Sequence, residues 1–471
     1  MSNRRRGDSP SAARARRGLS IIFVVIALVV LIGFVSLAVD VGRVRLAKAE
    51  LQTAADAAAL AGASGLELAP EDIGEAEFRA VSAGAENVGI DVQNSNGARY
   101  DRSIEIVPGE DVQYGIWRRD SRIFEVLEDY GNDIDERRRA NAVRAFGRRG
   151  GTFTQEDMDG NTLTFERNNG LKLIFAPVLP DGPLTGHIET RAIAIIEGGR
   201  QGMGFIGLDW VRFVGTTLVD SYNAAVESYP GADGIPNQDA SISSNGNITL
   251  VGTTDIHGDV HPGIEADILP NPLTGDVEVT GYMHPLDKVL VEGVDYTVPT
   301  FSPTTLEPDT PYHGSPTSLS GDLLFKNWTT GGNDDVTINN LTGPVNIWVD
   351  GDFKHGGNAI IRIPGAVHAV NFYVDGDISI TGGNIIQLDS APPAILTFNV
   401  TKANTDVVVQ GVPALAAHIN APLSDLSFNG TGKLAFYGWA IGKTLTVTGN
   451  MELHYDQSRD VHHPWTTRLV K

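Results

Sequence analysis

Two Asp-Gly-Asp turns, at residues 350–352 and 375–377, carry the residues of this chain that are best suited to bind a metal ion. Each turn follows a copy of the same strand-like sequence. If the two copies stack in register, their carboxylates lie along one edge, about 5 Å apart per layer. Carboxylates that close together can chelate calcium, a hard cation that takes about 6–8 oxygen ligands. The pattern predicts a calcium site formed by Asp350, Asp352, Asp375 and Asp377.

The same four aspartates also suit a structural role, and this second interpretation is the favoured one. Aspartate side chains form hydrogen bonds with nearby backbone in turns, and Gly351 and Gly376 are expected to need a positive φ there. Calcium is the one cofactor considered, and no catalytic residue is predicted, because the chain has no nucleophile elbow, zinc-protease motif or phosphate loop. The histidines are scattered without metal-ligand spacing: His257, His261, His284, His355, His368, His462 and His463.

The strands that must position these turns repeat along the chain. Residues 345–352 and 370–377 are identical at six of eight positions. In each copy the first, third and fifth residues point to one face of a strand, and these are all apolar. Similar runs recur about every 20–25 residues, which is typical of a parallel β-solenoid over residues 241–460. A Pro-rich stretch at 298–316 is expected to be an excursion from it. The alternative is a β-sandwich, in which the same strands pair antiparallel.

Residues 19–39 are 21 residues without a charge, enough for a helix to cross a hydrocarbon core of about 30 Å. Six arginines precede this span, within a basic tail at residues 1–18. The positive charge places the tail in the cytoplasm. We therefore expect a single-pass protein of the cytoplasmic (inner) membrane that contacts membrane lipid through residues 19–39, with the bulk of the chain periplasmic or extracellular.

A cleaved signal peptide is the alternative to a retained anchor. Residues 36–38 (Ser-Leu-Ala) have the small residues of a cleavage site. The apolar core of a signal peptide is about 7–15 residues long, however, and no helix breaker follows this longer span. Retention is therefore favoured.

The rest of the chain divides by composition. Residues 40–69 are rich in alanine and predict a stalk helix, frayed by Gly62 and Gly65. Residues 70–199 mix a polar helix with short alternating runs and predict a small α+β domain. A linker or entry segment at 200–240, the β-solenoid and a C-terminal tail at 461–471 follow. The expected fold is thus a transmembrane helix with a stalk, an α+β domain and a mostly β remainder.

The N-terminal residues resemble a known family. Arginines, Gly18, an apolar span, Ala-Val-Asp-Val-Gly-Arg (38–43) and Leu-Gln-Thr-Ala-Ala-Asp-Ala-Ala-Ala-Leu-Ala (51–61) are similar to the TadE/TadG-like segment of tight-adherence (Tad/Flp) pilus assembly proteins. The resemblance implies a membrane anchor and other Tad-type pilus or envelope proteins as partners. Pilin-type precursors carry Glu five residues after the cleavage-site Gly, and this chain has Phe23 there. The resemblance therefore does not extend to processing and polymerisation as a pilin.

A second resemblance concerns the C-terminal half. Residues 242–250, 257–260 and 438–456 look like the beginning and the end of β-helical domains in bacterial envelope proteins. That likeness rests mostly on turn residues, so it implies a fold rather than an activity.

Composition narrows the function classes. The chain has no cysteine, which excludes disulfides and thiol chemistry, and its net charge is −22. Such a charge disfavours nucleic acid as a partner. Two functions remain: a non-enzymatic envelope protein in pilus assembly, adhesion or cell-surface architecture, and a membrane-tethered polysaccharide lyase or hydrolase on a β-helix. The anchor and the scarcity of basic residues near the Asp-Gly-Asp turns favour the first.

Overall fold

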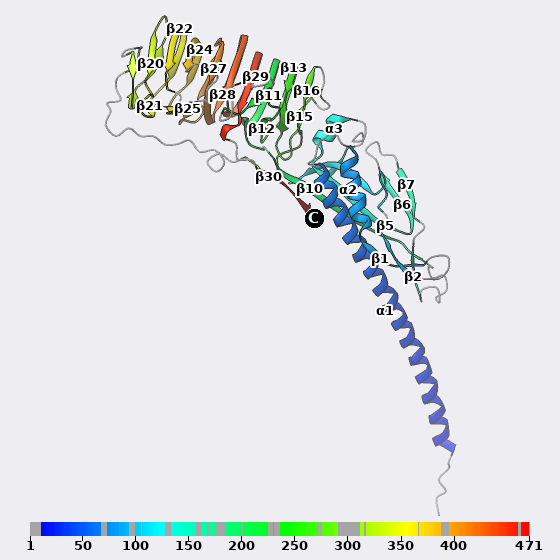
Figure 1. Ribbon diagram of the computed structural model, residues 1–471. Helices are drawn as coiled ribbons and strands as arrows, with labels where there is room; N and C mark the ends of the chain where they lie inside the picture. Colours follow the sequence, from blue (N-terminus) through cyan, green and yellow to red (C-terminus); the bar gives the residue numbers. More distant parts are fainter. Residues whose placement is uncertain are drawn as a thin grey trace, which may run out of the picture.

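The computed structural model describes residues 11–66, 73–93, 99–104, 106–127, 133–156, 162–167, 170–174, 185–199, 201–224, 229, 236–270, 273, 276–290, 311–314, 317–365, 367–387, 395–459 and 463–470 (Figure 1). A long N-terminal helix leads into a small domain of helices and antiparallel strands. A large region of parallel strands makes up most of the remainder. The chain is thus an apolar N-terminal helix followed by mostly β structure, as expected.

Helix α1 (Ser11–Leu66) is 56 residues long, or about 84 Å at about 1.5 Å per residue. Its large apolar side chains between Ile21 and Leu37 are exposed. In the described part of the chain it is the one helix long and apolar enough to cross a membrane. Such a stretch near the N-terminus suits a membrane anchor or a signal sequence. The predicted anchor and stalk are therefore two parts of one continuous helix.

The second half of α1 packs against protein through one face. Its buried positions recur every three or four residues, as on a single face of a helix. They are mostly alanines, so that neighbouring elements approach the helix axis closely: Ala47, Leu51, Ala54, Ala55, Ala58, Ala59, Ala63 and Leu66.

Helix α2 (Ile73–Ala85) packs on the end of α1 at two glycines. A Cβ added at Gly65 would overlap the Cα of Ala76, and one at Gly62 would lie 3.1 Å from the Cβ of Ala80. The expectation that these glycines fray the helix is wrong, because α1 continues through both to Leu66. The close contact with α2 stabilises a stretch whose glycines have low helix propensity.

A five-stranded antiparallel sheet covers the buried face of α1. Its order is β30 (His463–Val470), β10 (Ile188–Gly199), β5 (Ala142–Arg149), β3 (Val112–Arg118) and β4 (Ile123–Val126). Alternate residues such as Ala192 and Ala145 share a core with α1, whereas Ile195 and Trp117 belong to a small cluster on the other face. Three hairpins and helix α3 (Ile134–Arg139) complete the domain; the hairpins pair β1 (Val88–Gln93) with β2 (Arg99–Ser103), β6 (Gly151–Glu156) with β7 (Thr162–Arg167), and β8 (Leu171–Lys172) with β9 (Thr185–Gly186).

Strand β30 corrects the expected C-terminal tail at 461–471. Residues 463–470 form an edge strand that pairs antiparallel with β10, from Gly199↔His463 to Ile193↔Val470. The sequence indicates a short strand-forming run here, but its partner lies more than 260 residues earlier. A pairing over that separation cannot be read from local pattern.

The parallel region begins with β11 (Phe205–Tyr222), a long strand inside the linker or entry segment predicted at 200–240, so a linker is wrong for these residues. Its strand pairings in the described residues are all parallel, which excludes the antiparallel β-sandwich. The expected excursion at 298–316 lies mostly outside the described residues. The other strands are β12 (Ala240–Ser244), β13 (Ile248–Ile256), β14 (Gly258–His261), β15 (Ile268–Leu269), β16 (Val277–Val279), β17 (Ser318–Leu319), β18 (Asp322–Phe325), β19 (Trp328–Thr330), β20 (Asp335–Ile338), β21 (Val345–Val349), β22 (Phe353–Ile363), β23 (Val370–Val374), β24 (Ile378–Gln387), β25 (Leu396–Val400), β26 (Asp406–Gln410), β27 (Ala414–Ala416), β28 (His418–Gly438) and β29 (Ala440–Asp456).

The repeat identified in the sequence is a structural repeat. Strand β21 pairs with β23 in register, from Val345↔Val370 to Val349↔Val374. The first, third and fifth residues of both strands are buried, as predicted from their alternation. Each strand thus contributes the same three apolar positions to a shared core.

The chain joins this parallel region in its middle. Strand β11 pairs with β13 on one side and with the last strand, β29, on the other. Figure 1 shows the consequence: yellow and orange strands lead to red β29, and green β11, β13 and β16 continue beyond it. The first and last strands of the region are therefore neighbours in its interior.

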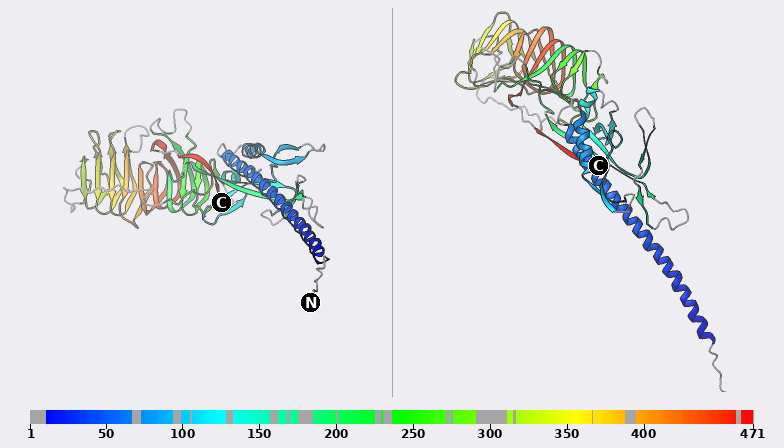
Figure 2. Two further views of the ribbon diagram at one scale, coloured as in Figure 1. Left: turned by 90° about the horizontal axis from the view of Figure 1, so that it is seen from below. Right: turned by 45° about the vertical axis from the view of Figure 1, so that its right-hand side comes forward.

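The parallel region is also an insertion between two neighbouring strands of the small domain. The chain leaves that domain after β10 and returns to it as β30, and Figure 2 shows the two parts meeting at this junction. A guanidinium nitrogen of Arg118 lies 2.6 Å from an Asp267 carboxylate oxygen, and the Gly198 amide donates to Asp287 at 2.6 Å. Contacts from several elements thus fix the parallel region on the small domain.

Candidate functional site

The predicted Asp-Gly-Asp turns stack on one edge of the parallel region. Asp352 Oδ1 accepts the backbone N–H of Asp377 at 3.3 Å, and Asp377 Oδ1 accepts the N–H of Asp406 at 3.0 Å. Asn327 occupies the equivalent place one layer earlier and accepts the N–H of Asp352 at 3.1 Å. The side chains therefore form a ladder that links each turn to the next layer.

The glycines of these turns act differently from the prediction. Neither Gly351 nor Gly376 has a positive φ, so the expected left-handed conformation is wrong. A Cβ added at Gly376 would lie 2.5 Å from the carbonyl carbon of Gly351. Glycine is required because the backbones of successive layers approach closely.

The charges of the ladder are partly compensated by protein groups. Lys354 Nζ lies 2.9 Å from Asp352 Oδ2, and this bond holds the pKa of Asp352 below its usual range. Asp375 accepts a hydrogen bond from the Thr401 hydroxyl at 3.3 Å. Among the described residues no group of three or more His, Asp or Glu side chains is arranged to hold a metal ion. Calcium at Asp350, Asp352, Asp375 and Asp377 stays a prediction.

A buried, hydrogen-bonded side-chain pair that the sequence did not reveal lies where β11 meets β29. His454 Nδ1 is 2.6 Å from Asp220 Oδ1, and both side chains are 1% exposed. The Tyr229 hydroxyl donates to Asp220 Oδ2 at 2.9 Å, and burial together with the Asp220 charge raises the pKa of Tyr229. Burial to this degree prevents a substrate from reaching the pair, so it joins strands rather than performs chemistry.

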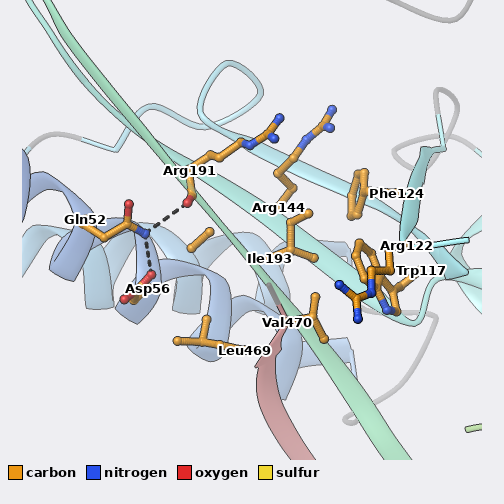
Figure 3. A pocket seen from close by; sticks show the side chains of 11 residues that line it. Gln52, Asp56, Trp117, Arg122, Phe124, Arg144, Arg191, Ile193, Leu469 and Val470 are labelled. Atoms are coloured by element: carbon orange, nitrogen blue, oxygen red, sulfur yellow. Dashed lines mark hydrogen bonds between the residues drawn. The ribbon is translucent and has the colours of Figure 1, made fainter. Parts of the chain in front are cut away.

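A pocket of about 680 Å³ lies beside α1 at the open edge of the antiparallel sheet (Figure 3). Unlike the Asp-Gly-Asp turns and the buried His454–Asp220 pair, this site combines a cavity with several charged side chains. The lining residues are Gln52, Asp56, Trp117, Arg122, Phe124, Arg144, Arg191, Ala192, Ile193, Leu469 and Val470.

In the described residues β30 pairs with only part of β10. The pairs run from Gly199↔His463 to Ile193↔Val470 and leave the Arg191 carbonyl to another partner. The Gln52 side chain donates instead to the Arg191 carbonyl at 3.0 Å, and to Asp56 Oδ1 at 2.7 Å. A side chain of α1 thus takes the place of a strand at this carbonyl.

Arg144 is the most constrained of the arginines in this pocket. Its guanidinium lies 4.5 Å above the centre of the Phe124 ring and donates from two nitrogens to Gln113 Oε1. Burial, together with the positive charges of Arg191 and Arg148, lowers the pKa of Arg144 to about 10. The side chain therefore remains charged at neutral pH, in surroundings that favour an anion.

Local sequence patterns do not predict this pocket, because its lining residues come from six elements. Arg144 and Ile193 are direct cross-strand partners only in the observed register. One signal was present: the alternation in β5 and β10 puts small residues such as Ala145 and Ala192 on one face and large ones such as Arg144 and Arg191 on the other.

Two family comparisons bear on the chain. Residues 18–65 match the family described as Flp pilus-assembly TadE/G-like. This is a Tad-type segment. It covers both the exposed apolar stretch of α1 and nearly all of its buried face. Residues 304–460, which span β17–β29 and follow β11–β16 in the chain, match a domain of unknown function, DUF7305.

Comparisons with individual proteins add little to what the family match of the Tad-type segment indicates. No curated protein matches the chain. Among solved structures, the competence-associated pilin ComZ from Thermus thermophilus is similar at 12% identity, covering 70% of this chain and 88% of that chain. The TM-score is 0.21, so this likeness carries no argument about fold or function.

Proposed function

We propose that the protein is a non-catalytic, membrane-anchored envelope protein that acts together with components of a Tad-type pilus. The observation that carries this proposal is the coincidence of the Tad-type segment with α1. The first half of that helix exposes a continuous apolar surface, and the second half is built into the small domain. One helix therefore links a bilayer to the folded part of the protein.

The anchor is retained and crosses the cytoplasmic membrane with the N-terminus inside. Six arginines before residue 19 support this orientation. The continuity of α1 through residues 36–38 supports retention, since a signal peptidase would cut within a helix whose remainder is packed against the sheet.

The parallel region is a β-solenoid held away from the membrane by the stalk. Its support is the parallel pairing of strands about 20–25 residues apart and the buried alternate side chains within them. Strand β28 pairs with β29 in three runs separated by register shifts, as expected where a coil turns its corners. Such a rigid, acidic body suits contact with other envelope or pilus proteins rather than with nucleic acid.

The proposal is tested by co-purification from the native cells. The full chain carrying a C-terminal affinity tag is extracted in an uncharged detergent, and the recovered proteins are identified by mass spectrometry. The control replaces residues 19–39 with a leucine span of the same length, which preserves an anchor but removes the Tad-type sequence. Tad-type pilus components recovered with the natural chain and lost with the control support the proposal. Equal recovery, or none with either chain, contradicts it.

A further inference from the structure

Three arginines of the pocket described above carry charges that the described protein does not compensate. No carboxylate oxygen of the described residues lies within 4.0 Å of the guanidinium nitrogens of Arg122, Arg144 or Arg191. This is unusual in a chain whose net charge is −22. An acidic protein offers abundant carboxylates, so three arginines around one cavity without a carboxylate partner in the described residues require an explanation.

Other arginines of the same domain show the ordinary pattern. Arg118 lies between Glu125 and Asp267 at 3.1 and 2.6 Å. Arg167 contacts Glu110 at 2.6 Å and Asp111 at 2.8 Å. The pocket arginines therefore differ from their neighbours in having a cavity where the others have a carboxylate.

The pocket brings Arg144 and Arg191 together, and Arg144 is the one that is held in place by its contacts. Figure 3 shows Arg144 and Arg191 extending in the same direction, and their mutual repulsion contributes to the lowered pKa of Arg144. Gln113 is a neutral partner of Arg144, so it orients the guanidinium without cancelling its charge. Arg122 has a φ of 56°, a costly conformation for a non-glycine residue.

The other residues that line the pocket indicate which chemical group a bound anionic ligand carries beside its negative charge. Trp117, Phe124, Ile193 and Val470 are aromatic or aliphatic and stand beside the arginines. A ligand that fits both parts has a carboxylate on an apolar body. Planar guanidinium groups bind carboxylates in a bidentate manner, with two parallel hydrogen bonds.

The distance of the pocket from the apolar span bears on whether a bound anion comes from a lipid headgroup, a nucleic acid or a protein. Gln52 is 13 residues beyond the end of the apolar span at Val39, or about 20 Å along the helix. If the span lies in the bilayer, lipid headgroups do not reach the pocket. This exclusion of lipid rests on the proposed membrane anchor. Nucleic acid is disfavoured by the overall negative charge.

We propose that this pocket binds an acidic peptide segment of a partner protein, with a carboxylate held by Arg144 and Arg191 and an apolar neighbour held by Trp117 and Phe124. Asp56, on the α1 side of the pocket, adds a negative charge to the lining that opposes a bound carboxylate.

Isothermal titration of the full chain in uncharged detergent tests the proposal. The probes are acetyl-Phe-Glu-Val-Glu-Val-amide and the same peptide with both glutamates replaced by glutamine. We expect the glutamate peptide to bind at least about tenfold more tightly. The variant R144Q/R191Q should remove this preference, and R191Q alone, at an exposed position, should weaken it. R212Q, at an arginine of the parallel region outside the pocket, should leave it intact.

Two further measurements decide between outcomes. D56N should tighten binding of the glutamate peptide, because it removes a negative charge from the lining. Glycerol phosphate, which carries the charge of a lipid headgroup, should not compete. Equal binding of both peptides, binding unchanged in R191Q, or competition by glycerol phosphate would each overturn the proposal. The titration does not depend on the Tad-type partner, so its failure and a failed co-purification are separate results.

Discussion

His454 and Asp220 are 234 residues apart in the chain, yet their side chains meet at 2.6 Å inside the parallel region. Asp220 belongs to its first strand, β11, and His454 to its last, β29. The two strands pair over nearly their whole length. The pair thus joins the first and last strands of the parallel region where they lie side by side.

Removal of one partner of this buried pair should be strongly destabilising. H454A leaves the Asp220 carboxylate buried without its hydrogen bond to His454, so we expect a loss of about 3 kcal/mol in the free energy of unfolding. The matched control is H257A. His257 pairs with Asp255 at 3.0 Å, but its side chain is 28% exposed, and such a pair contributes about 1 kcal/mol or less. Chemical denaturation measures both. Equal losses in the two variants would mean that the buried pair does not hold the strands together.

The spacing between successive layers should make Gly376 intolerant of any side chain. G376A places a Cβ against the Gly351 carbonyl, and we expect a loss of about 1–3 kcal/mol from the resulting shift of the backbone. G343A is the control, because a Cβ there has nothing within 4 Å. The comparison of melting temperatures is decisive: if both variants melt alike, layer contact does not explain the glycine.

Acid should weaken the fold through two buried histidines. Burial lowers the pKa of His261 to about 4, and burial together with His261 lowers the pKa of His284 to about 3. In the unfolded chain both titrate near about 6.5. Between that pH and about 4 the unfolded state binds more protons, so stability falls as the pH falls, by up to about 1.4 kcal/mol per pH unit per histidine.

The variant H261N/H284N should show a shallower dependence of stability on pH across this window. H313N, at an exposed histidine, should keep the natural dependence. Denaturation series at several pH values give the slopes directly. An unchanged slope in the double variant would show that these histidines are not buried in the neutral form.

Calcium should have no effect on the melting temperature. The Asp352 carboxylate already binds Lys354, and the ladder atoms Asp352 Oδ1 and Asp377 Oδ1 are used by backbone amides. Differential scanning calorimetry with millimolar calcium and with a chelator compares the two states. A rise in melting temperature with calcium that is lost in D352N/D377N would establish the metal site instead.

What could be predicted from the sequence was local. The alternation of Val345, Ile347 and Val349, and its repetition at 370–374, required no distant partner to be recognised. The 21 uncharged residues before Asp40 predicted an apolar helix by the same local logic. Helices and strands whose pattern lies within their own sequence could therefore be predicted without knowing their partners.

What could not be predicted depended on contacts between distant segments. Gly65 reads as a helix breaker until the backbone of Ala76 is placed against it. β30 reads as a tail until β10 is placed beside it. The pocket needs Gln52, Arg144 and Arg191 in one place, and their proximity follows from the sheet register and the position of α1. These relationships arise from packing, which local patterns do not encode.

The central claim is that α1 is a retained anchor that holds the folded part of the protein outside the cytoplasm. Because the chain has no cysteine, single cysteines introduced by S2C and T329C report the location of each end, and Thr329 lies exposed on the parallel region. A membrane-impermeant maleimide is applied to spheroplasts before and after lysis. We expect T329C to be labelled in intact spheroplasts and S2C only after lysis, both on the full-length chain in the membrane fraction. Labelling of S2C before lysis, or a soluble product that lacks the N-terminal segment, would contradict the account.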